Sequence, residues 1–555
     1  MIEIHREEAS KIISGIRECK SLAKAIKVQR AAPWPCLPTA DLPPKPVADQ
    51  LVEYYLRTTE TFYRILHVPS FERDYGALWV SDTPPDTAFL VQVKLVLAIG
   101  ALAFDEQFSM RTLTIRWIYE AKTWLSGPKF KSRLGIQSLQ TEILFLLARE
   151  LVNIDGEPMW ISAGALLRKA VFMGLHKDPT SLLISSHFAV EMRRRLWNTI
   201  LEINMQSGLM LGGPPFISLD DFDTECPGNF DDDQLTAEAP TPKREDEFTN
   251  ISIARAARKA FPIRLEATNF LNNFKSQGTY EETLRLDTEL RAAFKALSRS
   301  LNACNSKTGP SPSNFERRVV DFIMHRYLSA LHIPFFGPSL QETTYAYSRK
   351  VVVEASLKTW YAAYPLSFTT ADQQANDATG SKGNDLGRLV ACGSGFSRDT
   401  AWQAAILIAI ELRAQLQEEE SLGGIPLRPD LLSVLDDAKT WCLQCIRAGE
   451  INVKGYLLIC VLTAQIKGLR CGVEKEEIPR LIIKSAEESI EECLPILKGM
   501  MTGLVGDGPN EMASNNPVGV MEDWDFMMSD DMFNLGDVDP MGWIFNDEIA
   551  QGLSL

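Results

Sequence analysis

Two cysteines separated by two residues, Cys442 and Cys445, form the most reactive pattern in the chain. A Cys-x-x-Cys pair works as a dithiol redox site when it begins a helix, because the helix N-terminus lowers the pKa of the leading thiol. It contributes to a zinc site only when two further ligands follow at suitable spacing. Here Leu431 to Lys439 already has helical periodicity, and Cys460 and Cys471 are isolated. The sequence therefore favours a buried helical face over redox or metal chemistry.

Other catalytic patterns are missing from the sequence. The glycine-rich run at 392–395 has no strand before it and no third glycine after it, so a flexible loop explains it better than a phosphate-binding loop. No G-x-S-x-G, Walker lysine loop or H-E-x-x-H occurs. The histidines are dispersed, at positions His5, His67, His176, His187, His325 and His332. We predict a protein that is not an enzyme, with no catalytic, cofactor-binding or metal site; a helical enzyme of unknown type is the alternative.

The chain has 555 residues and a net charge of −15, which is unevenly distributed. Residues 499–555 carry eleven Asp and Glu and no Lys or Arg, so the rest is close to neutral. No basic cluster is present to bind a phosphate backbone. The apolar stretch 89–104 contains Gln92 and Lys94 and is too short and polar to span a bilayer. The acidic N-terminus is unlike a secretory signal, and ten scattered cysteines indicate a reducing compartment, the cytosol or the nucleus.

Residues 1–30 are predicted to form an amphipathic helix. Ile2, Ala9, Ile16 and Ala23 repeat every seven residues, so a dimerising coiled coil is the alternative. Prolines crowd residues 31–47 and predict an extended linker that separates this helix from the body. We therefore expect residues 1–28 to be dispensable for folding.

The remaining chain has helical periodicity with almost no strand-like alternation, which predicts an all-α fold: a large multi-helix domain with disordered loops. We divide it into a regulatory domain at 48–365, a flexible loop at 366–398, C-terminal helices at 399–500 and a disordered acidic tail at 501–555. The acidic segment 223–247 is predicted to be a surface loop. Helices are expected at about 48–66, 87–104, 109–125, 136–151, 157–174, 188–210, 248–275, 281–302, 315–332, 343–363, 399–420, 428–449, 453–469 and 476–500.

Four segments together resemble the fungal-specific transcription factor domain, the middle homology region of zinc-cluster regulators. Leu51 to Trp79 contains an aromatic helix, then His-x-Pro-x-Phe and a second helix. Trp160 to Pro179 contains a small-residue helix that ends in Gly-Leu-His. Glu191 to Asp233 contains an arginine-rich helix start with tryptophan, a glycine-proline turn and an acidic loop. Leu331 to Lys350 is a weaker fourth match.

The residues that carry this resemblance have readable packing roles. We expect Pro69 to end the first helix, Gly174 to cap another so that Leu175 folds back, and Arg193 to Arg195 to form a solvated helix edge, with a nuclear signal as the alternative. Asn204 and Gly213 replace the usual Asp and Arg of the family, which puts an internal ion pair in doubt. The full set is His67, Pro69, Phe71, Gly164, Arg168, Gly174, His176, Arg194, Arg195, Trp197, Gly213 and Pro214.

The resemblance implies a regulator of RNA polymerase II transcription in the nucleus, a pathway-specific activator of a secondary-metabolite cluster or a catabolic pathway. The family reads DNA through cysteines that hold two zinc ions, but only Cys19 and Cys36 precede Cys226 here. Zinc is therefore expected only if a missing upstream module exists, and DNA is contacted through that module or indirectly. The alternative is a corepressor or heterodimer partner of a complete zinc-cluster factor.

Residues 521–548 alternate acidic and bulky hydrophobic side chains, which is typical of amphipathic activation segments. Carboxylate repulsion keeps the hydrophobic groups exposed, so that a coactivator groove can capture them. A tail that docks on its own body is the alternative. The predicted hydrophobic anchors are Trp524, Phe526, Met528, Phe533, Leu535, Trp543 and Phe545.

Overall fold

A computed structural model describes residues 2–80, 85–128, 134–154, 156–182, 186–273, 278–304, 310–364, 384–422, 427–474 and 476–505. These residues form helices joined by turns and loops, and contain no β-strand, so the predicted all-α class is confirmed. The first eleven helices are α1 (Ile2–Arg30), α2 (Lys45–Arg57), α3 (Thr59–Tyr63), α4 (Val68–Ala77), α5 (Thr87–Gly100), α6 (Arg111–Ser126), α7 (Ile136–Val152), α8 (Met159–Phe172), α9 (His187–Leu211), α10 (Ser252–Lys259) and α11 (Phe261–Leu271). The others are α12 (Tyr280–Ala303), α13 (Asn314–His332), α14 (Phe336–Ser339), α15 (Ala346–Ala363), α16 (Asp385–Cys392), α17 (Phe396–Leu422), α18 (Pro429–Arg447), α19 (Lys454–Arg470) and α20 (Ile478–Val505).

Helix starts are set by side chains that satisfy the otherwise unpaired N–H groups of the first turn. At the start of α13 the hydroxyl of Ser313 accepts from the backbone N–H of Glu316, and the Glu316 carboxylate accepts from Ser313. Thr279 caps α12 and Asp86 caps α5 in the same way through one bond each. Local sequence chemistry therefore places these boundaries close to where periodicity predicts them.

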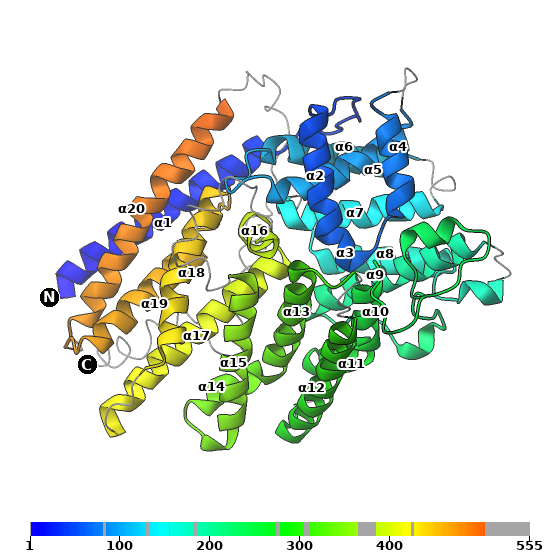
Figure 1. Cartoon of the computed structure of the whole chain (residues 1–555). Helices are drawn as coiled ribbons and strands as arrows, with labels where there is room; N and C mark the ends of the chain where they lie inside the picture. The colour runs from blue at the N-terminus through cyan, green and yellow to red at the C-terminus, as the bar shows by residue number, and fades with distance from the viewer. Residues whose placement is uncertain are drawn as a thin grey trace.

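The helices are arranged as one continuous stack, seen as a fan in Figure 1. At one end α5 lies between α2, α6 and α7, and all its residues from Leu90 to Gly100 are buried. The middle contains the neighbours α13, α15 and α17, and the other end contains α18, α19 and α20. One hydrophobic core runs through all of them, so the predicted segments 48–365 and 399–500 share a core.

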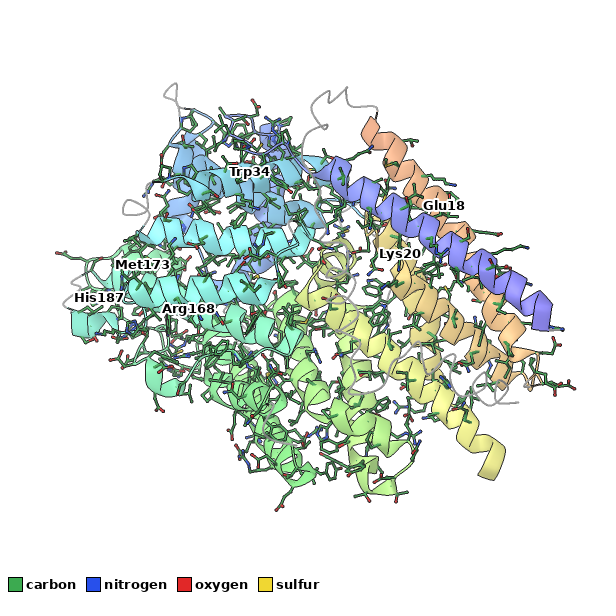
Figure 2. The ribbon with its side chains drawn as sticks, turned by 180° about the vertical axis from the view of Figure 1, so that it is seen from behind. Glu18, Lys20, Trp34, Arg168, Met173 and His187 are labelled. Carbon is green, nitrogen blue, oxygen red and sulfur yellow. The ribbon has the colours of Figure 1, made fainter. Side chains whose placement is uncertain are left out.

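The first helix is part of this body. Helix α1 lies against α20, and its Cys19 and Ile26 are fully buried. Figure 2 shows Glu18 beside α20, where its carboxylate lies 2.8 Å from the ammonium of Lys498. A Cβ on Gly15 would lie 2.7 Å from Ile490 Cγ2, so the two helices approach closely. The amphipathic helix packed on the body is confirmed. The linker does not hold this helix apart from the core, and the dispensability of residues 1–28 for folding stays a prediction.

The proline-rich segment after α1 has no helix, as predicted, but it is shorter than expected and is hydrogen-bonded to the body. It ends at Pro44, which begins α2. Thr39 is held by the buried ion pair of Lys94 and Glu120, whose charged atoms are 2.5 Å apart. The segment therefore runs along α6, and the Lys94 charge that interrupts the apolar stretch 89–104 has an internal partner.

No helix among the described ranges is long and apolar enough to cross a membrane.

The flexible loop predicted at 366–398 is wrong for its second half. Residues 384–398 contain α16 and the first turn of α17, and Leu386, Leu389 and Val390 are buried in the core. The polar composition around them concealed a short amphipathic helix capped by Asn384, whose side chain accepts from Gly387. The preceding part, 366–383, lies outside the described residues.

Candidate functional site

Two of the family-type residues singled out in the sequence, His67 and Arg195, meet around one buried carboxylate, Asp232. Its Oδ1 lies 2.7 Å from Arg64 Nη2 and 2.6 Å from Arg195 Nη1, and its Oδ2 accepts from the backbone of Val68 at 3.1 Å. Burial raises the pKa of the Asp232 carboxyl, but the charges of Arg64 and Arg195 outweigh it and lower that pKa to about 2. Asp232 therefore joins the α3–α4 corner to α9 as a permanently charged centre.

His67 completes this junction. Its Nε2 lies 2.9 Å from the backbone oxygen of Asp232, and its Nδ1 lies 2.8 Å from the hydroxyl of Ser70. A carbonyl oxygen only accepts, so Nε2 donates, and a neutral ring then accepts from Ser70 at Nδ1. His67 is thus a structural connector between α4 and the acidic segment.

Pro69 has a different role from the one predicted. It lies in the first turn of α4 and helps to begin that helix, while α3 has already ended at Tyr63. Proline suits a first helical turn because its missing N–H has no partner there. Phe71 is buried and packs against the rings of Tyr75 and Phe89.

The arginine run at the start of α9 is internal. Arg195 is fully buried, and Arg194 binds both oxygens of Asp178, at 2.9 and 3.0 Å, and one oxygen of Glu225 at 3.0 Å. Arg193 donates to the backbone oxygen of Met173 at the end of α8. The predicted solvated helix edge is therefore wrong, because carboxylates and carbonyls from neighbouring segments surround these guanidinium groups.

The acidic segment 223–247 is likewise more than a surface loop. Asp232 is buried, and Asp231 accepts from the backbone of Asn250 and pairs with Lys243, whereas Asp233 is exposed. Thr224 donates to the backbone oxygen of Leu175. The three consecutive acids thus have different surroundings: Asp232 pairs with buried arginines, Asp231 pairs with Lys243, and Asp233 faces solvent. Composition alone does not predict this difference.

The glycines of the family-type segments act through backbone geometry. Gly174 has φ +75° after α8; its N–H donates to Val171, and that of Leu175 donates to Ala170. These two backbone hydrogen bonds form the C-cap predicted for this position. Leu175 folds back and is fully buried, as expected. A Cβ on Gly213 would lie 2.7 Å from the Trp160 ring, whose Nε1 donates to Pro214. Gly213 therefore makes room for an indole.

The remaining family-type residues differ in burial and in their contacts. Trp197 is buried, with its ring centroid 5.6 Å from that of Phe222. Asn204 donates to the backbone of Ala163, so a hydrogen bond stands at the position where an acid is usual in the family. Arg168 is exposed on α8, which Figure 2 shows on the back of the molecule. Gly164 and His176 are half-buried.

Residues 52–283 match the family described as the fungal specific transcription factor domain. These residues carry that family's domain. It is 32% identical over 525 residues to transcription factor opdR of Penicillium oxalicum, covering 89% of this chain and 64% of that protein. It is 28% identical over 556 residues to transcription factor lepE of Aspergillus flavus, covering 92% and 65%. It is 27% identical over 440 residues to the aspyridones cluster regulator apdR of Emericella nidulans, covering 76% and 57%.

The chain thus spans less than two thirds of the length of each of these relatives. No solved structure gives a significant match. The matched segment of the fungal transcription factor domain contains every residue of the Asp232 junction, from Arg64 to Asp232. This junction joins two of the four resembling segments, Leu51 to Trp79 and Glu191 to Asp233.

The Cys-x-x-Cys pair lies among the C-terminal helices of the body, outside the matched segment. Cys442 and Cys445 are buried on α18, as the helical interpretation predicted. Burial raises the pKa of the Cys442 thiol far above its ordinary value and that of Cys445 to about 12. Both groups stay protonated at neutral pH, so neither is an activated thiol. Across the described ranges, no group of three His, Cys, Asp or Glu side chains is arranged to hold a metal ion.

Some functional candidates fall beyond what the structure describes, and others escaped sequence reasoning. All seven predicted tail anchors, Trp524 to Phe545, lie outside the described residues. Sequence reasoning missed the bidentate pair of Glu202 and Arg264, at 2.7 and 2.9 Å, because its members are far apart in the chain. Helical spacing of an acid on the buried face of α9 was the one signal that could have drawn attention to Glu202.

Proposed function

We propose that this protein is a pathway-specific regulator of RNA polymerase II transcription, acting in the fungal nucleus as an activator of a secondary-metabolite gene cluster. The observation that carries the proposal is the similarity to regulators along most of the chain, together with a family domain match at residues 52–283. The aspyridones cluster regulator among the relatives favours a metabolite cluster over a catabolic pathway. The chain is then a regulator rather than an enzyme.

Deletion of the gene in its host tests this function. Transcripts of one set of adjacent biosynthetic genes should fall, and reintroduction of the wild-type gene should restore them. RNA sequencing under conditions in which the gene is expressed measures the effect. A rise of the same transcripts would instead support the alternative function, a corepressor, and an unchanged transcriptome would contradict both. A fluorescent fusion should accumulate in the nucleus.

The acidic tail is the proposed activating part of the protein. Residues 505–555 fused to a heterologous DNA-binding domain should activate a reporter, because exposed aromatic groups can insert into a coactivator groove. An inserted anchor contributes about 2 kcal/mol or more, whereas one exposed charge contributes at most about 1 kcal/mol. Changing Trp524, Phe526, Phe533, Trp543 and Phe545 together to alanine should abolish activity, and Asp537→Asn should leave it nearly unchanged. Full activity in the aromatic variant would refute this mechanism.

DNA contact is assigned to a partner or to a zinc-cluster module outside these 555 residues. Within them, neither a cysteine cluster nor a basic stripe occurs. The purified chain should therefore show no sequence-specific gel shift at physiological salt, with or without zinc. A salt-resistant, sequence-dependent shift by the isolated chain would overturn this assignment. Sedimentation of the same sample determines whether it forms a homodimer, the other partner state that we propose.

A further inference from the structure

A cavity of about 410 Å³ lies where the family domain meets the C-terminal helices. Its wall comes from the end of α7, residues 153–154 and 156–158, the start of α8, the end of α9, and helices α17, α18 and α19. This volume is within the range of small-molecule sites in proteins. The apolar part of the wall contains Met159, Met210, Trp402, Trp441 and Tyr456. A ligand there would touch both halves of the body at once.

Two arginines in the wall already have carboxylate partners. Arg149 lies 2.5 Å from Glu157, and it also donates to Ser162. Arg398 pairs with Glu450, and it donates to the backbone oxygens of Val390 and Ala391. These positive charges are therefore neutralised and oriented by the protein itself, which leaves little of their hydrogen-bonding capacity for an anionic ligand.

Two carboxyls in the same wall have no such partner. Glu150 accepts only one long bond, 3.4 Å from the backbone N–H of Phe396. No described side chain donates a hydrogen bond to Asp399, although Arg398 and Arg326 act on it electrostatically. Burial raises the pKa of both carboxyls to about 7, with a further rise for Glu150 from the charge of Asp399 and for Asp399 from the charge of Glu450. Their charged forms are thus only partly compensated in the unliganded protein.

Close approaches of glycine hold Glu150 and Trp402 in the cavity wall. Gly395 has φ +71°, and a Cβ there would lie 2.5 Å from Glu150 Cγ, so the turn before α17 wraps around this side chain. A Cβ on Gly455 would lie 2.6 Å from Trp402 Nε1, so α19 lies directly on the indole. The arrangement brings aromatic faces and two unpaired acids to one cavity.

We infer that this cavity is an effector site for a small organic ammonium ion, whose charge pairs with Glu150 and Asp399 and whose apolar body packs on Trp402 and Trp441. Indole faces attract cations, most strongly where water is excluded. A ligand cation would supply the compensation that the two acids lack. The binding does not depend on the proposed transcriptional role; only its regulatory consequence rests on that function.

Calorimetry on the purified full chain tests the inference with three matched probes: phenethylammonium, neutral 2-phenylethanol and anionic 3-phenylpropionate. The ammonium probe should bind with a dissociation constant of about 1 mM or lower, and each of the others at least about tenfold more weakly. Equal affinity for all three probes, preference for the anion, or no heat from the ammonium probe would overturn the inference.

Variants locate the site. Asp399→Asn and Glu150→Gln should each weaken ammonium binding about tenfold, because each keeps the side-chain shape and removes one charge. Asp436→Asn on α18 is the matched control, since Asp436 is exposed and pairs with Lys467 outside the cavity. Circular dichroism confirms folding of each variant, and the probe series on the wild-type chain is informative even if a variant fails to fold. Unchanged affinity in both cavity variants would refute the site.

The two proposals fail in distinguishable ways. If the ammonium probe binds but gene deletion leaves transcription unchanged, the transcriptional function is wrong and the cavity site is retained. If deletion silences a gene cluster but no probe binds selectively, the regulator is retained and the effector site is wrong.

Discussion

Asp232 and Asp399 are both carboxyls held among helices, but their surroundings are opposite. Asp232 contacts two guanidinium groups and a backbone N–H, and its pKa falls to about 2. Asp399 receives no hydrogen bond from a described side chain, and burial raises its pKa to about 7. The difference separates two uses of an acid inside the fold: a paired one fixes the fold, whereas one without a hydrogen-bonding side chain costs stability and is retained where a ligand can supply the partner.

The largest expected effect is at the paired site. Asp232→Asn should destabilise the full chain by about 3 to 5 kcal/mol, because it leaves Arg64 and Arg195 buried without their counter-charge. Urea unfolding followed by circular dichroism measures the change. Asp233→Asn is the control, one residue away but exposed, and should change stability by no more than about 0.5 kcal/mol. Equal losses in both variants would mean that the pairing around Asp232 does not matter.

Removing the charges of Glu150 and Asp399 should change stability in the opposite direction. The double variant Glu150→Gln, Asp399→Asn should stabilise the unliganded chain at pH 8 by about 1 to 3 kcal/mol, since two uncompensated charges are removed. Thermal unfolding of variant and wild type, compared at one protein concentration, measures the gain. A loss of stability would show that these acids have partners in solution, and the contrast with Asp232 would disappear.

The pH dependence sharpens the same comparison. Folding raises the pKa of Glu150 and Asp399 to about 7, so their destabilising effect is absent below their ordinary values and grows until the pH passes about 7. The gain of the double variant should therefore be large at pH 8 and vanish near pH 4. Burial also raises the pKa of Glu60 to about 7. Glu60 is present in both the wild type and the double variant, so its effect on stability cancels from the difference between them.

For Asp232 the sign is reversed. Its folded pKa lies below its ordinary value, so its stabilisation is complete above about pH 4 and is lost as the pH falls toward 2. The deficit of Asp232→Asn should accordingly shrink in acid. A gain or deficit that stays constant with pH in either variant would contradict the corresponding assignment of charge.

The smallest expected effect concerns the support of the paired site. Ser70→Ala removes the group that bonds His67 Nδ1, 2.8 Å away, and should destabilise the chain by about 1 kcal/mol. Denaturant titration resolves such a change when variant and wild type share the same slope. A loss as large as that of Asp232→Asn would make His67, rather than the ion pairs, the main element of the junction.

The sequence predicted the helical class and most helix boundaries well, because apolar periodicity and capping residues are local. Helix α9 was expected at 188–210 and lies at His187–Leu211, and the cap at Gly174 follows from its position before Leu175. Segments judged by composition were predicted less well. The polar stretch around 384–398 contains α16, and Pro69 begins a helix rather than ending one.

What the sequence determined by itself is the set of helices, the family domain and the sorting of acidic residues into a terminal segment, since each depends on neighbours along the chain. Only the tertiary structure decided which charges meet. Arg64 follows α3, Arg195 lies in α9 and Asp232 lies in the acidic segment 223–247, whereas Glu150 lies in α7 and Asp399 in α17. A charged side chain is stabilised or penalised by whatever lies within a few ångströms of it, and helix packing brings residues that are far apart in the chain within that distance.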